Sequence, residues 1–152
     1  MLLFHGSPGI GKTYFCAGLI EYAVRKFPHE FRYFSERELF TRLRTCISEG
    51  HGDYLWELGR LTDSYFLILD DVGSNINPQH VSYKDHEWKR EIFFSFLDIR
   101  YNLQMPTVIT SNFTKEDFKE IYSERICSRL FAKENTIISL FGSEHDKRTQ
   151  GL

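Results

Sequence analysis

A run of eight residues near the start of the chain has the types and the spacing of a phosphate-binding loop. The pattern G-x-x-x-x-G-K-[ST] is matched in full by Gly6, Ser7, Pro8, Gly9, Ile10, Gly11, Lys12 and Thr13. Glycines let a backbone bend until successive N–H groups point at one phosphate, and a following helix adds the partial positive charge of its first turn. Lys12 would reach the β- and γ-phosphates, and the Thr13 hydroxyl would be a ligand of Mg²⁺. Because a glycine turn that served packing alone would explain neither side chain, we predict a site for a nucleoside triphosphate with magnesium.

Two acidic residues follow the most hydrophobic run of the chain. The apolar residues Phe66 to Leu69 lead directly into Asp70 and Asp71. Ligands of open α/β sheets bind outside the carboxyl ends of the strands, where this pair would lie. We predict that Asp70 holds Mg²⁺ directly or through water, and that Asp71 orients or deprotonates the attacking water. Both acids could instead cap the strand or begin the next loop, and for Asp71 this alternative stays open.

Asn112 is a third polar candidate, because it follows the apolar run Thr107 to Thr110. An amide both donates and accepts hydrogen bonds, so Asn112 could contact the γ-phosphate and position the water. A turn residue before a helix that starts at Thr114 would explain Asn112 equally well.

Arginines near the end of the chain are the remaining candidates. Arg125 and Arg129 are four residues apart and would share one helix face. A solvated face or a salt bridge to Glu124 is the simpler explanation. The functional alternative is an arginine finger that stabilises the charge of the γ-phosphate in the transition state. Arg148 is a further candidate for the nucleotide, although its local sequence is that of a surface residue.

Elements that could position these residues alternate along the chain. The predicted strands are short apolar runs at residues 2–4, 31–34, 66–69, 107–110 and 136–141. The predicted helices span residues 12–26, 36–48, 86–103 and 115–122, the last with Thr114 as its N-cap and Asp117 three residues further on. In the third helix Ile92, Phe96 and Ile99 form a stripe that a sheet must cover. Alternating strands and helices predict an α/β sandwich with a parallel sheet.

Composition limits the possible classes of protein. A chain of 152 residues with 41% hydrophobic and 26% charged residues is expected to fold as one domain, residues 1–152. The net charge of −2 argues against a broad nucleic-acid-binding surface. The cysteines Cys16, Cys46 and Cys127 are far apart and are expected to be reduced thiols, which favours a cytoplasmic location. No run of residues is apolar enough to span a membrane.

Taken together and in order, these segments resemble the AAA+ ATPases of the DnaC/IstB type. The segments are LLFHGSPGIGKT, FLILDDVG, RYNLQMPTVITSN and SERICSRL. The family contains loaders of replicative helicases (DnaC, DnaI and phage equivalents) and helper ATPases of certain transposons. The resemblance covers nearly the whole chain. It implies a P-loop NTPase fold of the AAA+ type: a three-layer sandwich with a five-stranded parallel sheet in the order 5-1-4-3-2, without a separate helical lid.

The same resemblance implies roles for individual residues and for partners. ATP would be the nucleotide, and Asn112 would be the sensor of its γ-phosphate. Arg129, with Arg125 beside it, would be the finger that acts on ATP held by an adjacent subunit, and Arg148 would be a second sensor. A replicative helicase and single-stranded DNA would be the partners, together with self-association through ATP. The N-terminal region that grips the helicase or DNA in this family is not in the sequence, and Ser74 to Asp85 is longer than is typical of it.

Three other functions are compatible with parts of the pattern. Asp71 stands where most AAA+ proteins have Glu, and the shorter side chain fits an interaction module that binds ATP and hardly hydrolyses it. A helper ATPase of a transposon is the alternative within the family. A small P-loop kinase would need a mobile basic lid, whereas Lys89 and Arg90 lie within an apolar helical pattern. A GTPase is disfavoured because the sequence has no N-K-x-D motif.

Overall fold

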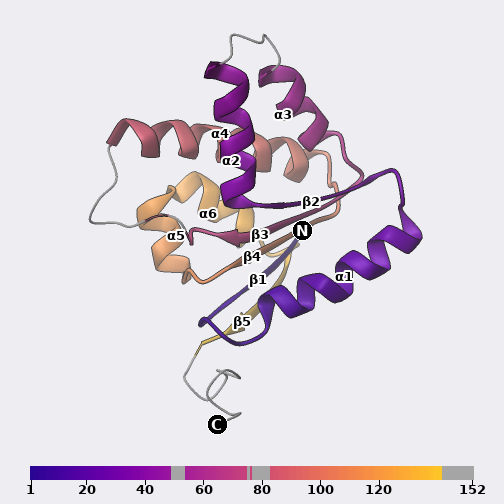
Figure 1. The fold of residues 1–152 in the computed structure, drawn as a ribbon. Helices are drawn as coiled ribbons and strands as arrows, with labels where there is room; N and C mark the ends of the chain where they lie inside the picture. The colour runs from indigo at the N-terminus through magenta and orange to yellow at the C-terminus, as the bar shows by residue number, and fades with distance from the viewer. Residues whose placement is uncertain (49–53, 75, 77–82, 142–152) are drawn as a thin grey trace.

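In the part of the chain that the computed structural model describes, residues 1–48, 54–74, 76 and 83–141, five parallel strands form one sheet (Figure 1). The strands are β1 Leu2–Gly6, β2 Phe31–Ser35, β3 Phe66–Val72, β4 Thr107–Ser111 and β5 Thr136–Leu140. Their order across the sheet is β2-β3-β4-β1-β5, which is the order 5-1-4-3-2 counted from the other edge. All four pairs of neighbouring strands are parallel. The expected AAA+ sheet is therefore confirmed.

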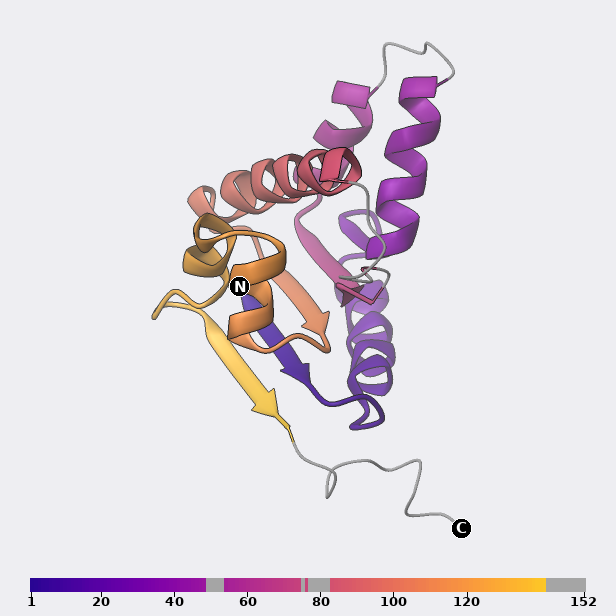
Figure 2. The same ribbon diagram turned by 90° about the vertical axis from the view of Figure 1, so that its left-hand side faces the viewer.

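Helices lie on both faces of this sheet. They are α1 Lys12–Lys26, α2 Glu36–Ser48, α3 Tyr54–Thr62, α4 Tyr83–Asn102, α5 Lys115–Ile121 and α6 Glu124–Leu130. Figures 1 and 2 show α1 on one face and the other helices on the opposite face. The predicted bounds of α1 and α2 are confirmed, and α4 begins three residues earlier than predicted. The short helix α3, which contains Gly59, was not predicted.

Alternate residues of the strands supply the two cores. Leu3, Leu67 and Ile109 pack in the larger core, with residues of α2, α4, α5 and α6. Ile68 and Val108, which are adjacent to Leu67 and Ile109 in their strands and so point to the other face, pack with residues of α1. Because both faces are covered, the strands read as continuous apolar runs rather than as alternating ones.

The buried stripe of α4 differs from the predicted one. Ile92 and Phe96 are buried as expected, but Ile99 is exposed. Leu97 is buried as well, and the next buried position after it is Arg100, which lies four residues after Phe96 and shares its helix face. The buried stripe of α4 therefore ends in the charged residue Arg100, where the sequence pattern predicts the neighbouring Ile99.

Arg100 is 0% exposed and ties the amino-terminal edge of the sheet together. Its guanidinium donates to the carbonyl oxygens of Thr62, Ser64 and Pro106, at 2.8 to 2.9 Å. Its Nε donates to the hydroxyl of Thr107 at 2.8 Å, and burial lowers the pKa of the guanidinium to about 10. The side chain thereby satisfies the acceptors of the segments that lead into β3 and β4, which water would otherwise have to solvate.

The chain shows two further features at this level. Within the described residues no helix is long and apolar enough to cross a membrane. Cys16, Cys46 and Cys127 are free thiols, as expected.

Replacement of Arg100 by methionine should destabilise the fold by about 3 kcal/mol, because several buried carbonyl groups would lose their donor. Urea denaturation followed by circular dichroism measures this free energy of unfolding. Arg25→Met is the matched control, since Arg25 pairs with Glu21 on the exposed surface of α1. The control should change stability by less than about 0.5 kcal/mol. Equal stability of the two variants would contradict the structural role of Arg100.

Candidate functional site

The glycine loop joins the end of β1 to the start of α1, as the motif requires. Gly6 passes so close to β5 that a Cβ atom there would lie 1.9 Å from the carbonyl oxygen of Leu140. Ser7 N–H donates to the same oxygen at 2.9 Å. Gly11 has φ 97° at the N-cap of α1, and its carbonyl accepts the N–H of Phe15 at 2.8 Å. Glycine is thus required by steric contact at Gly6 and by backbone conformation at Gly11.

A cavity of about 480 Å³ lies over this loop. Its lining comes from three segments of the chain and consists of Pro8, Gly9, Gly11, Lys12, Thr13, Tyr14, Asp71 and Asn112. The ends of β3 and β4 therefore bring the predicted Asp71 and Asn112 to the predicted phosphate loop. Gly6, Ser7 and Ile10 support the loop from outside this lining; Ile10 is buried, and its side chain packs near Gly6.

Lys12 holds a positive charge inside the loop. Its Nζ donates to the carbonyl oxygens of Gly6 and Ser7, at 2.8 and 2.9 Å. The side chain is buried, while Thr13 beside it is exposed at the cavity. These bonds hold the ammonium group beside the loop whose backbone N–H groups would face a phosphate.

Asp70 lies beneath the cavity rather than in its lining, and is 4% exposed. Its Oδ1 accepts the hydroxyl of Thr110 and, at 3.6 Å, the thiol of Cys16. Its Oδ2 accepts the hydroxyl of Tyr33 at 3.0 Å. Burial, and then the charge of Asp70, raise the pKa of the Cys16 thiol and of the Tyr33 phenol to about 12. Both groups therefore keep their protons and remain donors to Asp70 at neutral pH.

Asp71 reaches the cavity because the strand is irregular at this point. The pairing of β3 with β4 shifts register between Leu69 and Val72, and Asp71 has φ 60°. Its N–H donates to the hydroxyl of Thr110 at 2.9 Å. Positive φ is uncommon outside glycine and costs about 1–3 kcal/mol, so the surrounding contacts must impose it. Thr110 thus bonds both acidic residues, one through the carboxylate and the other through the backbone.

The segment around Asn112 is fixed by hydrogen bonds on both sides. Ser111 Oγ donates to the carbonyl of Val72 at 2.6 Å and accepts the N–H of Phe113 at 3.0 Å. The predicted N-cap at Thr114 is confirmed, since its side chain and that of Asp117 form a reciprocal capping box. These contacts hold Asn112 between a strand end and a helix start, and leave its side chain at the cavity.

His5 connects this segment to the neighbouring strands. Its Nδ1–H donates to the carbonyl of Phe113 at 2.8 Å, which leaves Nε2 to accept the hydroxyl of Ser139 at 2.5 Å. Burial lowers the pKa of His5. The hydrogen bond to Phe113 and the charge of Glu116 raise it, but these effects are smaller than that of burial. The charge of Lys12 lowers it further. His5 is therefore a neutral bridge between the ends of β1, β4 and β5.

Arg125 and Arg129 lie elsewhere, where α6 packs on α4. The Arg125 guanidinium lies 3.9 Å from the centre of the Phe94 ring, and that of Arg129 lies 5.4 Å from it. Arg129 also donates from Nε and Nη2 to one oxygen of Asp98, at 2.9 and 2.8 Å. Neither arginine is among the described residues that line the cavity, and α6 lies on the face of the sheet opposite α1 (Figure 2). The predicted finger is thus separate from the phosphate loop of the same chain.

Two expectations fall outside the described residues. Arg148 is one, and the other is most of the polar segment from Ser74 to Asp85.

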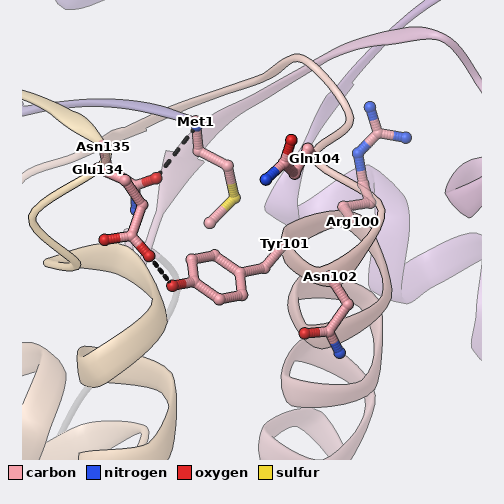
Figure 3. A pocket seen from close by; sticks show the side chains of 7 residues that line it. All are labelled: Met1, Arg100, Tyr101, Asn102, Gln104, Glu134 and Asn135. Carbon is pink, nitrogen blue, oxygen red and sulfur yellow. Dashed lines mark hydrogen bonds between the residues drawn. The ribbon is translucent and has the colours of Figure 1, made fainter.

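A second cavity, of about 450 Å³, lies at the amino-terminal edge of the sheet (Figure 3). Met1, Gln104 and Asn135, which precede β1, β4 and β5, are among its lining residues. In Figure 3 the Tyr101 hydroxyl meets the Glu134 carboxylate, and the Arg100 guanidinium points away from the other side chains. The phosphate loop and the acidic pair are at the opposite, carboxyl-terminal edge of the sheet, around the first cavity.

The sheet order, the glycine loop and the acidic strand end together define a P-loop domain of the AAA+ type. Comparison with known families agrees, because the model of the IstB-like ATP-binding proteins matches residues 1–131. The chain belongs to this family. The resemblance to DnaC/IstB-type ATPases is therefore confirmed, as is ATP binding as the class of activity.

Solved structures with the same fold include proteins of DNA replication. The DnaC helicase loader is 26% identical with a TM-score of 0.71, over 91% of this chain and 76% of its own. DnaI is 24% identical with a TM-score of 0.64, over 90% of this chain and 69% of its own. The replication initiator DnaA bound to AMPPCP and single-stranded DNA is 19% identical with a TM-score of 0.73, over 95% of this chain and 41% of its own. A comparison with curated protein sequences gives no significant match.

His5, Tyr33 and Thr110 belong to the site but were not predicted from the sequence as site residues, and neither were Tyr14 in the cavity lining and Cys16 beside Asp70. Thr110 could have been found, because it lies on the same face of the sheet as Asp70 once β3 and β4 are neighbours. His5 and Tyr33 carry no motif. Their roles depend on which strands are adjacent and on how far each side chain reaches.

His5 should make stability depend on pH. Because its pKa is lowered in the folded state, the unfolded chain binds a proton below about pH 6.5 that the folded chain does not bind. Stability should therefore fall as the pH drops from 7.5 to 5.5, by no more than about 1.4 kcal/mol per pH unit for this one group. Urea denaturation of wild type and His5→Gln at both pH values measures the effect. The variant should lose less stability than wild type over this range; an equal loss would contradict the assignment.

Proposed function

We propose that this domain is a magnesium-dependent ATPase that acts as a switch in a DNA-replication assembly and delivers a replicative helicase onto single-stranded DNA. The observation that carries the proposal is the convergence of Lys12, Thr13, Asp71 and Asn112 on one cavity. Family membership supports ATP as the nucleotide. The likeness to the DnaC helicase loader, and to DnaA bound to single-stranded DNA, supports the helicase and the DNA as partners. The net charge of −2 adds no support for DNA binding.

The residues present suit Mg²⁺. Thr13 and Asp70 offer hydroxyl and carboxylate oxygens, which are the hard ligands that this ion prefers. When bound, the ion neutralises negative charge on the β- and γ-phosphates. Lys12 and the N–H groups from Gly9 to Thr13 bind and orient the same phosphates. Arg148 is retained in this proposal as a contact of the nucleotide.

Asp71 and Asn112 would act on the attacking water. Asp71 accepts a hydrogen bond from the water and orients or deprotonates it, and the Asn112 amide contacts the γ-phosphate. The backbone N–H of Asp71 donates to Thr110 on the neighbouring strand β4, and Ser111, next to Asn112, donates to the carbonyl of Val72 on β3. A site that is fixed before the substrate arrives lowers the reorganisation needed to reach the transition state.

Arg125 and Arg129 would complete the site of a second subunit. They lie away from the cavity of their own chain, so a contribution to hydrolysis requires an adjacent copy. Arg125 is exposed, whereas Arg129 is held by Asp98 and would have to exchange this partner for a phosphate. The isolated subunit should accordingly hydrolyse ATP slowly.

Two alternatives within the family keep specific support. The matching family model is that of the IstB-like proteins, which favours a helper ATPase of a transposon equally well. The unusual backbone of Asp71 together with its short side chain favours an ATP-dependent interaction module with little hydrolysis. A kinase is disfavoured further, because Arg90 donates to the carbonyl of Glu120 at 3.1 Å and to that of Ile121, and so caps α5 rather than a substrate.

Binding and turnover should separate in two variants. Lys12→Ala should weaken the binding of fluorescent ATP at least about tenfold, because the loop loses its point charge. Asp71→Asn should bind ATP as wild type does and lose turnover by about 100-fold or more, because the general base is gone. Equilibrium titration and phosphate release measure the two properties.

The controls for this pair are Lys26→Ala at the far end of α1 and the exposed Asp63→Asn beyond α3. Neither should change binding or turnover. If Asp71→Asn hydrolyses ATP as fast as wild type, hydrolysis does not depend on this base, and the interaction module becomes the better proposal.

Mixing two inactive variants should restore activity if the finger acts between subunits. The Lys12→Ala subunit keeps the arginine finger but lacks a working phosphate site. The Arg129→Ala subunit keeps the phosphate site but lacks the finger. A 1:1 mixture should hydrolyse ATP several-fold faster than the sum of its components, and wild-type turnover per subunit should rise with protein concentration.

Asp98→Asn is the matched control, because it weakens the ion pair with Arg129 and leaves the arginine in place. It should retain turnover. Repeating the mixture with Arg125→Ala identifies which arginine is required. A turnover per subunit that is high and independent of concentration, with no gain on mixing, would rule out a finger in trans.

A further inference from the structure

The carboxylate of Asp70 is held by two hydroxyl groups from the strands on either side. Thr110 on β4 donates to Oδ1, and Tyr33 on β2 donates to Oδ2 at 3.0 Å. The sheet order makes this possible, because β3 lies between β2 and β4. Tyr33 differs from its surroundings in one respect: it is 36% exposed, whereas Asp70 and Thr110 are buried.

We propose that Tyr33 is a positioning residue for the magnesium site, and that its hydroxyl holds the Asp70 carboxylate in the orientation in which it binds the metal or a metal-bound water. This inference rests on the proposed function, and it adds to it a residue that no motif contains. Tyr33 acts through Asp70 and does not itself touch nucleotide or metal.

Bonds to both oxygens are needed to fix a carboxylate. A donor on Oδ1 alone leaves the group able to rotate about the bond to Cβ, which is a soft torsion. Donors on Oδ1 and Oδ2 together set the plane of the carboxylate. Outer partners of this kind orient metal ligands, and their loss typically costs about 10–100-fold in metal affinity.

The two hydroxyls do not exclude a metal. A carboxylate has about four positions at which it can accept hydrogen bonds or bind a cation. Within the described residues, Thr110, Cys16 and Tyr33 occupy three of them. The remaining acceptor position is free for a metal or a metal-bound water, and the other three bonds fix the direction in which it points. Tyr33 therefore affects how the carboxylate is oriented toward the metal and does not compete with the metal for the carboxylate.

A packing role alone would require only the ring of Tyr33. The change Tyr33→Phe keeps the ring and removes the oxygen that contacts Asp70. It should leave the fold intact, since one hydrogen bond from a partly exposed side chain contributes on the order of 1 kcal/mol. The test is therefore possible in a folded protein, and thermal unfolding verifies this.

The experiment is a titration of fluorescent ATP binding with Mg²⁺, and a second titration in EDTA. For Tyr33→Phe, the Mg²⁺ concentration at half-maximal enhancement of ATP binding should rise about tenfold. Affinity in EDTA should equal that of wild type, because the loop and Lys12 bind phosphate without the metal. Binding of Mn²⁺ to the protein with ATP, followed by electron paramagnetic resonance, should weaken by a similar factor. Tyr22→Phe, on the exposed side of α1, should change neither quantity.

Each other outcome overturns the inference in a distinguishable way. If Tyr33→Phe has the wild-type Mg²⁺ dependence, Tyr33 does not position Asp70, and the proposed function stands. If the variant loses affinity equally in Mg²⁺ and in EDTA, its role is structural. If wild-type binding of ATP does not depend on Mg²⁺ at all, the metal site of the proposed function fails, and the role of Tyr33 fails with it.

Discussion

The hydroxyl of Thr110 joins β3 and β4, the two strands whose ends bring Asp71 and Asn112 to the cavity. It donates to the carboxylate of Asp70 and accepts the N–H of Asp71, so one side chain fixes both members of the acidic pair. The two acids are thereby separated by role: Asp70 is turned toward α1 and buried, and Asp71 is turned into the cavity. The left-handed backbone of Asp71 costs free energy, and the bond to Thr110 helps to offset it.

Buried polar groups are found at both edges of the sheet, and their roles differ between the two edges. At the amino-terminal edge Arg100 satisfies carbonyl groups of the connecting segments, which is a contribution to stability. At the carboxyl edge His5, Asp70 and Thr110 form bonds that fix the backbone and side chains around a cavity. The middle of the sheet, between these edges, is apolar on both faces. The buried polar groups at the carboxyl edge therefore serve mainly to orient the side chains around the cavity rather than to stabilise the fold, as is typical of sites that bind charged ligands.

The site residues that belong to local sequence motifs could be predicted from the sequence. The residues whose role depends on which strands are neighbours in the sheet could not. Lys12, Thr13 and Asp71 belong to motifs whose spacing is fixed by the chain itself, and the strand runs follow from burial on both faces. Tyr33 and His5 act through neighbours more than 30 and 100 residues away, as their bonds to Asp70 and Phe113 show, and nothing beside them in the sequence marks this. The exposure of Ile99 was missed for a related reason: a helical period allows several adjoining stripes, and packing on the sheet selected the one that contains Arg100.

The position of the arginines gives the proposed switch its physical basis. Phe94 and Asp98 of α4 hold Arg125 and Arg129 on the side of the molecule away from the phosphate loop. A single chain thus carries a phosphate site and a candidate finger that cannot serve one another. Two chains placed in series would bring them together, with ATP between the two surfaces. Loss of the γ-phosphate would then remove the charge that holds the guanidinium across the interface, so hydrolysis itself would weaken the assembly that made it possible.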